Sequence, residues 1–162
     1  MVEACIAFGS NIGNREANIS TALRILKQKI KIIKTSSLFE TKPMYLENQN
    51  WFLNGVVIIE TEIKPKELLG VLKRIEKQMG RKEVERNGPR IIDLDILFYK
   101  NLIMNEDNLR IPHPKIQERA FVLVPLAEIE PDFVHPVYKK NIAQLLSELK
   151  YDKSEIKKSP FR

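Results

Sequence analysis

One stretch organises the rest of the chain: Gly88-Pro89-Arg90-Ile91-Ile92-Asp93-Leu94-Asp95-Ile96-Leu97. From Ile91 to Tyr99, β-branched and aromatic residues recur at period two after a Gly-Pro turn, which predicts a strand. Alternation along that strand directs both aspartates to one face. The other face carries an uninterrupted apolar stripe, formed by Ile92, Leu94, Ile96 and Phe98.

The aspartate pair is a candidate metal site. Asp93 and Asp95 are separated by roughly 6.6–7 Å along a strand, close enough to share a cation or to hold two neighbouring ones. Two like charges on an apolar strand repel each other and resist desolvation, so they require cations or donors nearby. Oxygen ligands without a neighbouring His or Cys favour Mg²⁺ over zinc.

The loop that precedes the strand is basic. It runs from Arg81 to Arg90 and also contains Lys82 and Arg86, as a magnesium–polyphosphate site would require. A half-solvated strand whose aspartates form surface ion pairs with arginines would show the same pattern. The Asp-x-Asp spacing alone therefore leaves both interpretations open.

Composition predicts one soluble globular domain. The 162 residues are 43% hydrophobic and 30% charged, and no apolar run approaches the roughly 18 residues of a membrane helix. Met1 leads straight into a strand-like segment, so we expect no signal peptide. The single cysteine, Cys5, excludes an internal disulfide and favours a reduced compartment, the cytoplasm. A net charge of +6 indicates an anionic partner: nucleic acid, a membrane surface or a phosphorylated small molecule.

The order of elements predicts the fold. Hydrophobic periodicity predicts strands at residues 2–8, 31–41, 51–62 and 91–99, with helices at 15–29 and 65–79. We expect Asn14 to cap the first helix and Gly80 to end the second. This β-α-β-β-α-β order predicts an α+β, ferredoxin-like antiparallel sheet covered by helices.

The remaining segments follow this core. Lys100-Asn101 is predicted as a hairpin tip, with residues 102–104 as its return strand. Residues 119–129 and 141–149 are predicted to be helical and form an appended C-terminal helical segment. Residues 151–162 are charged and weakly patterned, so we expect a frayed tail. The predicted organisation is therefore one domain, residues 1–150, and a C-terminal tail, residues 151–162.

Four polar residues need a structural or functional explanation. Asn54 lies on the face of its strand that carries Phe52, and a buried amide must pair with backbone, a neighbouring loop or a ligand. An amide beside an aromatic ring suits a flat heterocycle. His113 stands between two prolines that restrict its backbone, so it is either pre-organised to contact a phosphate or a surface residue of a stiff loop. Glu76 is expected to be solvated unless a site lies over its helix, and His135 to be structural.

Five segments together resemble the 6-hydroxymethyl-7,8-dihydropterin pyrophosphokinase family of folate biosynthesis. They occur in order over nearly the whole chain, and the aspartate segment and the last one are the most specific. The segments are Ala7–Asn11, Phe52–Asn54, Gly88–Ile96, Pro112–Pro114 and Arg119–Pro131.

The resemblance implies a reaction and a role for each matching residue. The family transfers the β,γ-pyrophosphoryl group of ATP to the pterin hydroxymethyl oxygen and releases AMP. By resemblance, Asp93 and Asp95 hold two Mg²⁺ ions, and Arg81 and Arg90 close over the phosphates within a lid formed by residues 81–90. The other implied contacts are to ATP, from Glu76, His113 and Arg119, and to the pterin, from Pro43, Met44, Tyr45, Phe52, Asn54 and Phe121.

The chain departs from the family pattern at Phe52, Lys73, Glu83, Asn87 and Asn108, which affects expected affinity and lid closure more than the reaction class. Two alternatives remain. A basic RNA-binding module of the same fold would need exposed sheet aromatics and an RNP pattern, which the sequence lacks. Another Mg²⁺-dependent nucleotidyltransferase would release pyrophosphate rather than AMP. We expect a monomer that binds ATP and the pterin, and neither nucleic acid nor a membrane.

Overall fold

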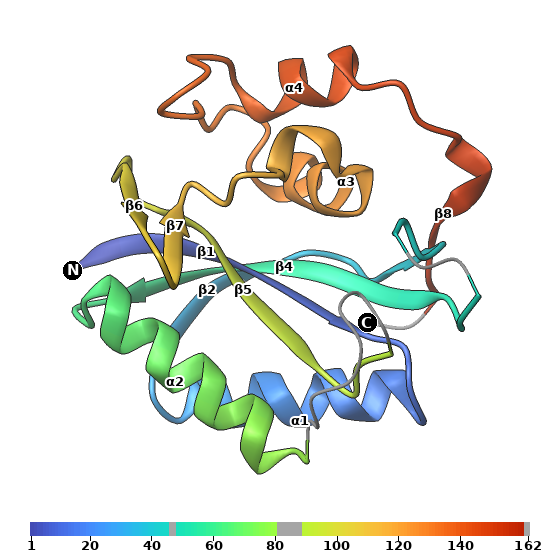
Figure 1. Cartoon of the computed structure of the whole chain (residues 1–162), viewed down its shortest axis with the longest axis horizontal. Helices are drawn as coiled ribbons and strands as arrows, with labels where there is room; N and C mark the ends of the chain where they lie inside the picture. Colours follow the sequence, from blue (N-terminus) through green and yellow to red (C-terminus); the bar gives the residue numbers. More distant parts are fainter. Residues whose placement is uncertain (46–47, 81–88, 161–162) are drawn as a thin grey trace.

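The computed structural model describes residues 1–45, 48–80 and 89–160 (Figure 1). Within these ranges, no helix is long and apolar enough to cross a membrane. In chain order the elements are β1 (Val2–Ser10), α1 (Arg15–Lys27), β2 (Lys31–Thr35), β3 (Phe39–Thr41), β4 (Phe52–Thr61), α2 (Pro65–Gln78), β5 (Asp93–Tyr99), β6 (Met104–Glu106), β7 (Leu109–Ile111), α3 (Ala120–Ile129), α4 (Ile142–Glu148) and β8 (Ile156–Lys158).

The main sheet has the strand order β5-β1-β4-β3-β8, and β2 pairs with β4 beside β3. Every one of these pairings is antiparallel. The two strands that follow α2 and α1 therefore flank a central pair made by β1 and β4, as in a ferredoxin-like fold. The predicted α+β fold class is confirmed.

Local sequence signals account for the helix ends. Oδ1 of Asn14 accepts a hydrogen bond from the backbone N–H of Ala17 at 3.1 Å, so Asn14 is the N-cap of α1. Pro65 is the first residue of α2. The N–H that proline lacks would have no partner within the helix at this position. Gly80, just after that helix, has a φ of +85°, which glycine adopts without steric conflict. Both predicted signals are confirmed.

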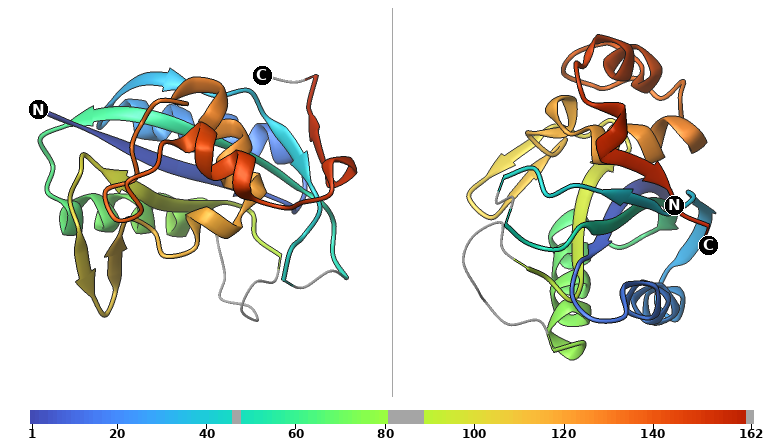
Figure 2. Two further views of the ribbon diagram at one scale, coloured as in Figure 1. Left: turned by 90° about the horizontal axis from the view of Figure 1, so that it is seen from above. Right: turned by 90° about the vertical axis from the view of Figure 1, so that its right-hand side faces the viewer.

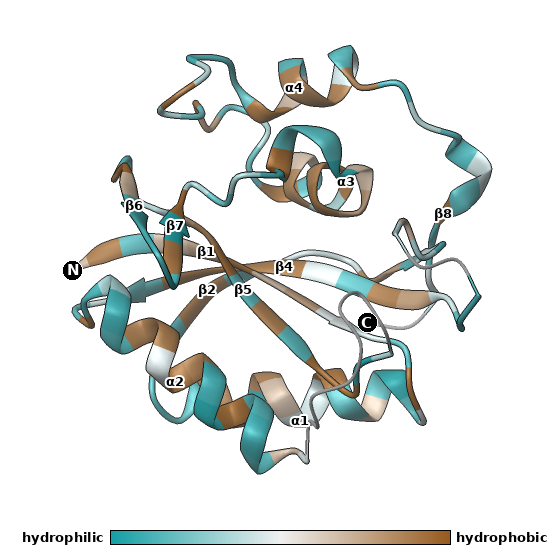
Figure 3. Cartoon of the chain, in the orientation of Figure 1, coloured by the Kyte–Doolittle hydropathy of each residue, from teal (hydrophilic) through white to brown (hydrophobic). Residues whose placement is uncertain are grey.

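The sheet separates two apolar cores (Figures 1 and 2). Helices α1 and α2 cover one face through residues that include Ile19, Leu26, Leu68 and Leu72. Helices α3 and α4 cover the other face, and their core also contains Cys5, whose thiol pKa is raised by burial. Figure 3 shows the central strands β1 and β4 as largely apolar, whereas α2 alternates between apolar and polar residues, as expected for a helix with one exposed face.

A β-bulge in β5 changes the direction of its last side chains. Cys5 pairs with Phe98, but the next residue of β1 pairs with Ile96, so Leu97 is an extra residue. Phe98 therefore packs under α3 and α4. The hydroxyl of Tyr99 reaches the opposite side and donates to the carbonyl of Ile63 at 2.6 Å. The prediction that Phe98 shares a face with Ile96 is wrong, because alternation fails at a bulge.

Three other predicted features differ. The strand predicted for residues 31–41 is two strands, β2 and β3, separated where Ser36 exchanges hydrogen bonds with the backbone of Val56. The predicted return strand does not pair with β5, because β6 pairs with β7 in a separate hairpin. The tail is not frayed over residues 156–158, because β8 pairs with β3 and Ser159 N–H donates to Leu38 at 2.8 Å. In Figure 2 this C-terminal segment runs from α4 to the sheet edge.

Candidate active site

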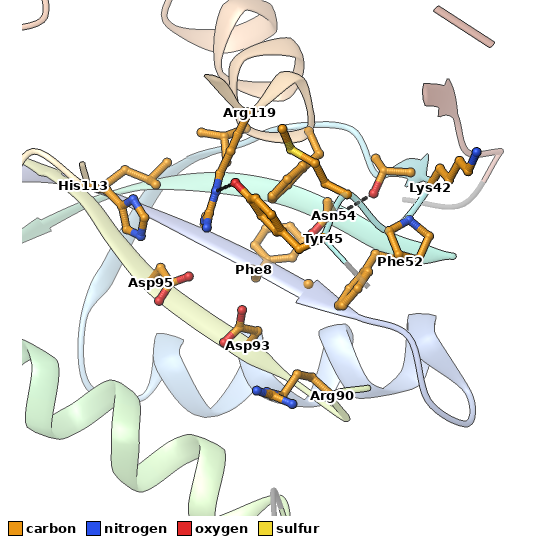
Figure 4. A pocket seen from close by; sticks show the side chains of 18 of the residues that line it. Phe8, Lys42, Tyr45, Phe52, Asn54, Arg90, Asp93, Asp95, His113 and Arg119 are labelled. Atoms are coloured by element: carbon orange, nitrogen blue, oxygen red, sulfur yellow. Dashed lines mark hydrogen bonds between the residues drawn. The ribbon is translucent and has the colours of Figure 1, made fainter. Parts of the chain in front are cut away.

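A cavity of about 260 Å³ opens on the α3 face of the sheet, at the end of β1 and the start of β4 and β5. α3 and α4 pack over the other half of this face, on Val56, Ile58 and Leu97. The cavity brings together most of the candidate residues, which come from five separate parts of the chain (Figure 4). Those lining it are Pro43, Met44, Tyr45, Phe52, Asn54, Arg90, Asp93, Asp95, His113, Arg119 and Phe121.

The two aspartates of β5 are paired with small residues of the neighbouring strand, β1. Asp93 pairs with Gly9 of β1, and Asp95 pairs with Ala7, so neither carboxylate is crowded by its neighbour on that strand. Figure 4 shows both side chains pointing from β5 into the cavity. Alternation before the bulge explains why both point the same way, as predicted.

The aspartates fit a magnesium site that a substrate would complete. Among the residues the structure describes, no group of three or more His, Cys, Asp or Glu side chains could hold a metal ion by itself. Mg²⁺ is commonly held by one or two carboxylates, with substrate phosphates and water filling its other positions. The donor set of Asp93 and Asp95, open toward the cavity, matches that chemistry.

Asn54 is held across one strand from the aspartates. Gly9 pairs with Asn54 on one side and with Asp93 on the other, so the two backbones are about 10 Å apart. Nδ2 of Asn54 donates to Oγ1 of Thr41 at 2.5 Å. A Cβ added to Gly9 would lie 2.3 Å from Oδ1 of Asn54, so only a glycine leaves room for this amide.

The loop residue Tyr45 connects the aromatic side of the cavity to its cationic side. Its ring lies 4.9 Å from Nζ of Lys115 and 5.2 Å from the guanidinium carbon of Arg119, both within cation–π distance. Nε of Arg119 donates to the Tyr45 hydroxyl at 3.0 Å. The same guanidinium lies 5.4 Å from the ring of Phe121. The pterin and ATP contacts implied by the resemblance are thus adjacent.

His113 is a neutral hydrogen-bond donor at pH 7. Burial lowers its pKa to about 4, and the nearby charges of Arg119 and Lys115 act in the same direction. Nδ1 accepts the backbone N–H of Lys115 at 3.2 Å, so the neutral ring carries its proton on Nε2. The backbone N–H of His113 donates to Leu97 at 2.9 Å, which holds the residue against β5. A neutral ring can donate a hydrogen bond to an anion without adding charge.

The charge of the cavity favours a polyanion. Of the described residues lining it, Lys42, Lys73, Arg90 and Arg119 are cationic, and Asp93 and Asp95 are anionic. A nucleotide phosphate chain would find an excess of positive charge there.

Glu76 does not line the cavity, and the expectation that it is solvated is wrong. Its side chain is 4% exposed, and Oε2 accepts the backbone N–H of Leu94 at 2.8 Å. Nζ of Lys73 lies 3.7 Å from Oε1 of Glu76. Arg81 and the rest of the predicted lid up to residue 88, including Glu83 and Asn87, lie outside the described residues.

Asn11, for which the sequence predicted no role beyond its place in the Ala7–Asn11 segment, is a buried residue that joins three segments of the site. Its Oδ1 accepts the N–H of Arg90 at 2.7 Å, and its backbone N–H donates to the Arg90 carbonyl at 3.0 Å. Its Nδ2 donates to Gln49 at 2.8 Å and to the Asn50 carbonyl at 3.0 Å. The sequence signal was an asparagine directly after a buried strand, where a side-chain amide often hydrogen-bonds the backbone of a loop. Thr41 was missed for lack of any local signal.

Fold and site together define a class. One cavity is lined by two carboxylates that could hold Mg²⁺, by cationic side chains and by an amide with aromatic neighbours. Enzymes that transfer phosphoryl groups from a nucleotide act through such metal-binding and cationic groups. Comparison with known sequences gives the family. The profile of the 7,8-dihydro-6-hydroxymethylpterin-pyrophosphokinase family matches residues 5–131, and the chain belongs to this family. The family resemblance inferred from the five sequence segments is confirmed.

Similar proteins differ in length. The 2-amino-4-hydroxy-6-hydroxymethyldihydropteridine pyrophosphokinase of Aquifex aeolicus is 40% identical over 148 residues, which cover 91% of this chain and 92% of the relative. The folic acid synthesis protein FOL1 of Dictyostelium discoideum is 46% identical over 131 residues, 81% of this chain but 20% of that protein. The chain thus spans about a fifth of the length of this longer relative.

Solved structures agree in fold. The HPPK-DHPS of Plasmodium falciparum crystallised with SDX-DHP aligns with a TM-score of 0.76 at 21% identity, covering 91% of this chain and 43% of that one. At this identity the similarity shows the fold alone.

Proposed function

We propose that this chain transfers the β,γ-pyrophosphoryl group of ATP to the hydroxymethyl oxygen of 6-hydroxymethyl-7,8-dihydropterin and releases AMP, a step of folate biosynthesis. The observation that carries the proposal is the placement of Asp93 and Asn54 on either side of Gly9 in one open cavity. A site for phosphate-bound cations and a site for the edge of a heterocycle are thereby about two strand spacings apart. The family and the Aquifex relative named above support the same reaction.

On the pterin side, Asn54 offers its Oδ1, because Nδ2 is engaged by Thr41. An amide oxygen accepts hydrogen bonds from the amino and ring N–H groups of a pterin. Phe52 and Phe121 line the same space and would contact the ring, with Pro43, Met44 and Tyr45 over it. Fixed polar atoms among aromatic groups orient a flat ligand.

On the nucleotide side, Arg90 and Arg119 supply fixed positive charge, and His113 supplies a neutral donor from Nε2. The guanidinium groups would bind phosphate oxygens in bidentate fashion. Mg²⁺ held by Asp93 and Asp95 would neutralise phosphate charge and polarise the transferred group. We propose two such ions.

The reaction forms one bond and breaks one. The pterin hydroxyl oxygen attacks the β-phosphorus, and the bond from that phosphorus to the oxygen shared with the α-phosphate breaks. That oxygen leaves with AMP, and the hydroxyl proton passes to solvent. The chain contributes mainly by aligning the hydroxyl with the β-phosphorus, since a loose transition state needs little help from a general base.

An RNA-binding role fits the structure less well. Recognition of bases on a ferredoxin-like sheet needs an open face with exposed aromatics. Here α1 and α2 cover one face, and α3 and α4 cover much of the other. We propose that the chain acts as a monomer in the cytoplasm, which size-exclusion chromatography and cell fractionation would test.

Phosphorus NMR tests the proposed reaction. The protein is incubated with MgATP and 6-hydroxymethyl-7,8-dihydropterin, and the products are assigned. We expect AMP and a pterin diphosphate, formed only when both magnesium and the pterin are present. Release of pyrophosphate would assign the chain to the nucleotidyltransferases instead. ADP as the product would also overturn the proposal.

A further inference from the structure

The backbone amide of Leu94 lies between the two predicted metal ligands and points away from the sheet. β5 is the edge strand beside β1, and successive residues of an antiparallel strand direct their N–H groups alternately toward and away from the partner. Leu94 is opposite Phe8, yet its N–H donates to Glu76. Asp93 and Asp95 therefore direct their backbone groups toward β1.

The side chain of Glu76 reaches the outer edge of β5. It projects from the last turns of α2, which packs on β5 through a core that contains Ile75 and Leu94. Its carboxylate is almost fully buried and accepts the Leu94 N–H at 2.8 Å. A buried polar group is unfavourable unless it is hydrogen-bonded, so loss of this bond would leave the Leu94 amide without its acceptor. The contact is therefore a strong restraint on the strand.

We propose that Glu76 is a positioning residue that holds the edge of β5 at Leu94. It would thereby keep the carboxylates of Asp93 and Asp95 at the separation that the Mg²⁺ ions require. This inference rests on the proposed function for the role of the two aspartates. It gives Glu76 a role other than the ATP contact implied by the family resemblance. A side chain that does not line the cavity can thereby control the geometry of two that do.

The physical reason lies in the edge position. On the β1 side, the backbone groups of the aspartates are held by the sheet. On the outer side, the amide between them has Glu76 as its acceptor. Without that acceptor the amide must find water, which requires the strand to move outward or twist. Ligands displaced by even about 1 Å bind a metal–phosphate group poorly.

Amide hydrogen exchange in the ligand-free protein tests the restraint directly. Three variants are compared with the original chain: Glu76→Ala removes the acceptor, Glu76→Asp keeps the charge but shortens its reach, and Glu76→Gln keeps an acceptor without charge. Glu67→Ala, at an exposed position of the same helix, is the matched control. We expect exchange at Leu94 to accelerate about tenfold or more in E76A and E76D, and to stay within about threefold in E76Q and E67A.

Magnesium dependence of AMP formation tests the consequence. We expect E76A and E76D to need at least about fivefold more Mg²⁺ for half-maximal rate, with the KM for the pterin unchanged and with rescue by E76Q. If E76A and E76D fail to fold by circular dichroism, E76Q must still keep both Leu94 protection and the Mg²⁺ requirement.

Two results overturn the inference. One is unchanged Leu94 exchange in folded E76A or E76D. The other is an E76Q protein with a raised KM for ATP but original Leu94 exchange and Mg²⁺ dependence, which would make Glu76 a nucleotide contact. An original chain that forms no AMP refutes the proposed function, and the exchange data alone then decide whether Glu76 restrains Leu94.

Discussion

Replacing Gly9 with alanine perturbs the floor of the cavity by a single methyl group. The new Cβ would lie 2.3 Å from Oδ1 of Asn54, 3.4 Å from its Cγ and 3.6 Å from Cδ1 of Phe52. The first separation is far inside van der Waals contact, so the Asn54 amide must move. Its hydrogen bond to Thr41, 2.5 Å long, would break, and Oδ1 would leave the position from which it can accept from a pterin.

The magnitude follows from these contacts. A buried acceptor left without its donor destabilises a protein by about 1–3 kcal/mol, and alanine in place of glycine in a strand offsets up to about 1 kcal/mol of this. We therefore expect the free energy of unfolding of G9A to fall by about 1 kcal/mol. Loss of one hydrogen bond to the ligand, about 1.5 kcal/mol, weakens pterin binding roughly tenfold.

The assay is fluorescence titration of the pterin in the presence of a non-hydrolysable ATP analogue, together with urea unfolding. Gly70→Ala is the control, because Gly70 lies within α2 and an added Cβ would come no nearer than 3.5 Å to Arg74. G70A should be more stable by about 0.5–1 kcal/mol, with unchanged pterin affinity. A G9A protein with the original affinity and stability would refute the reasoning.

Three further predictions concern the ligands, the pH and the C-terminus. Asp95→Ala should lower the rate of AMP formation at least about 100-fold while the melting temperature stays within a few degrees; undiminished turnover would contradict the metal assignment. Folding lowers the pKa of His113 from 6.5 to about 4, so the unfolded chain takes up the proton first as the pH falls. The free energy of unfolding should therefore be constant above pH 6.5 and fall by up to about 3 kcal/mol as the pH drops toward 4. H113Q should reduce this slope in urea titrations, and His135, whose pKa burial also lowers, should retain part of it; an unaltered slope would rule out the His113 contribution. Truncation after Lys150 removes β8 and the bond from Lys42 N–H to Glu155 at 3.0 Å, so we expect a melting temperature several degrees lower and weaker pterin binding through Thr41; an unchanged affinity would show that β8 does not support the cavity.

Part of the candidate site could be predicted from local pattern. Asp93 and Asp95 share a face because side chains alternate along a strand, and both line the cavity as alternation requires. Asn54 could be recognised because an amide within an apolar strand must have a partner. The structure gives it a partner, Thr41, and places its oxygen close to Gly9.

Other parts could not be predicted because they depend on contacts between distant segments. The amphipathic pattern of α2 left Glu76 at the margin of the apolar stripe, and only the packing of α2 on β5 buries it against Leu94. Asn11 is 79 residues from Arg90, to which it is hydrogen-bonded. Neither residue carries a local sign of its partner.

The sequence by itself determined the β-α-β-β-α-β order of the core, the apolar faces of α1, α2 and the start of β5, the helix cap and stop, and the family, because these depend on periodicity and on short motifs. Only the tertiary structure decided the bulge at Leu97, the pairing of β8 with β3 and the buried role of Glu76. All three depend on which segment of the chain supplies a hydrogen-bond partner to the backbone of an outer strand, β5 or β3. That choice is made by segments remote in the chain, so no local pattern could have encoded it.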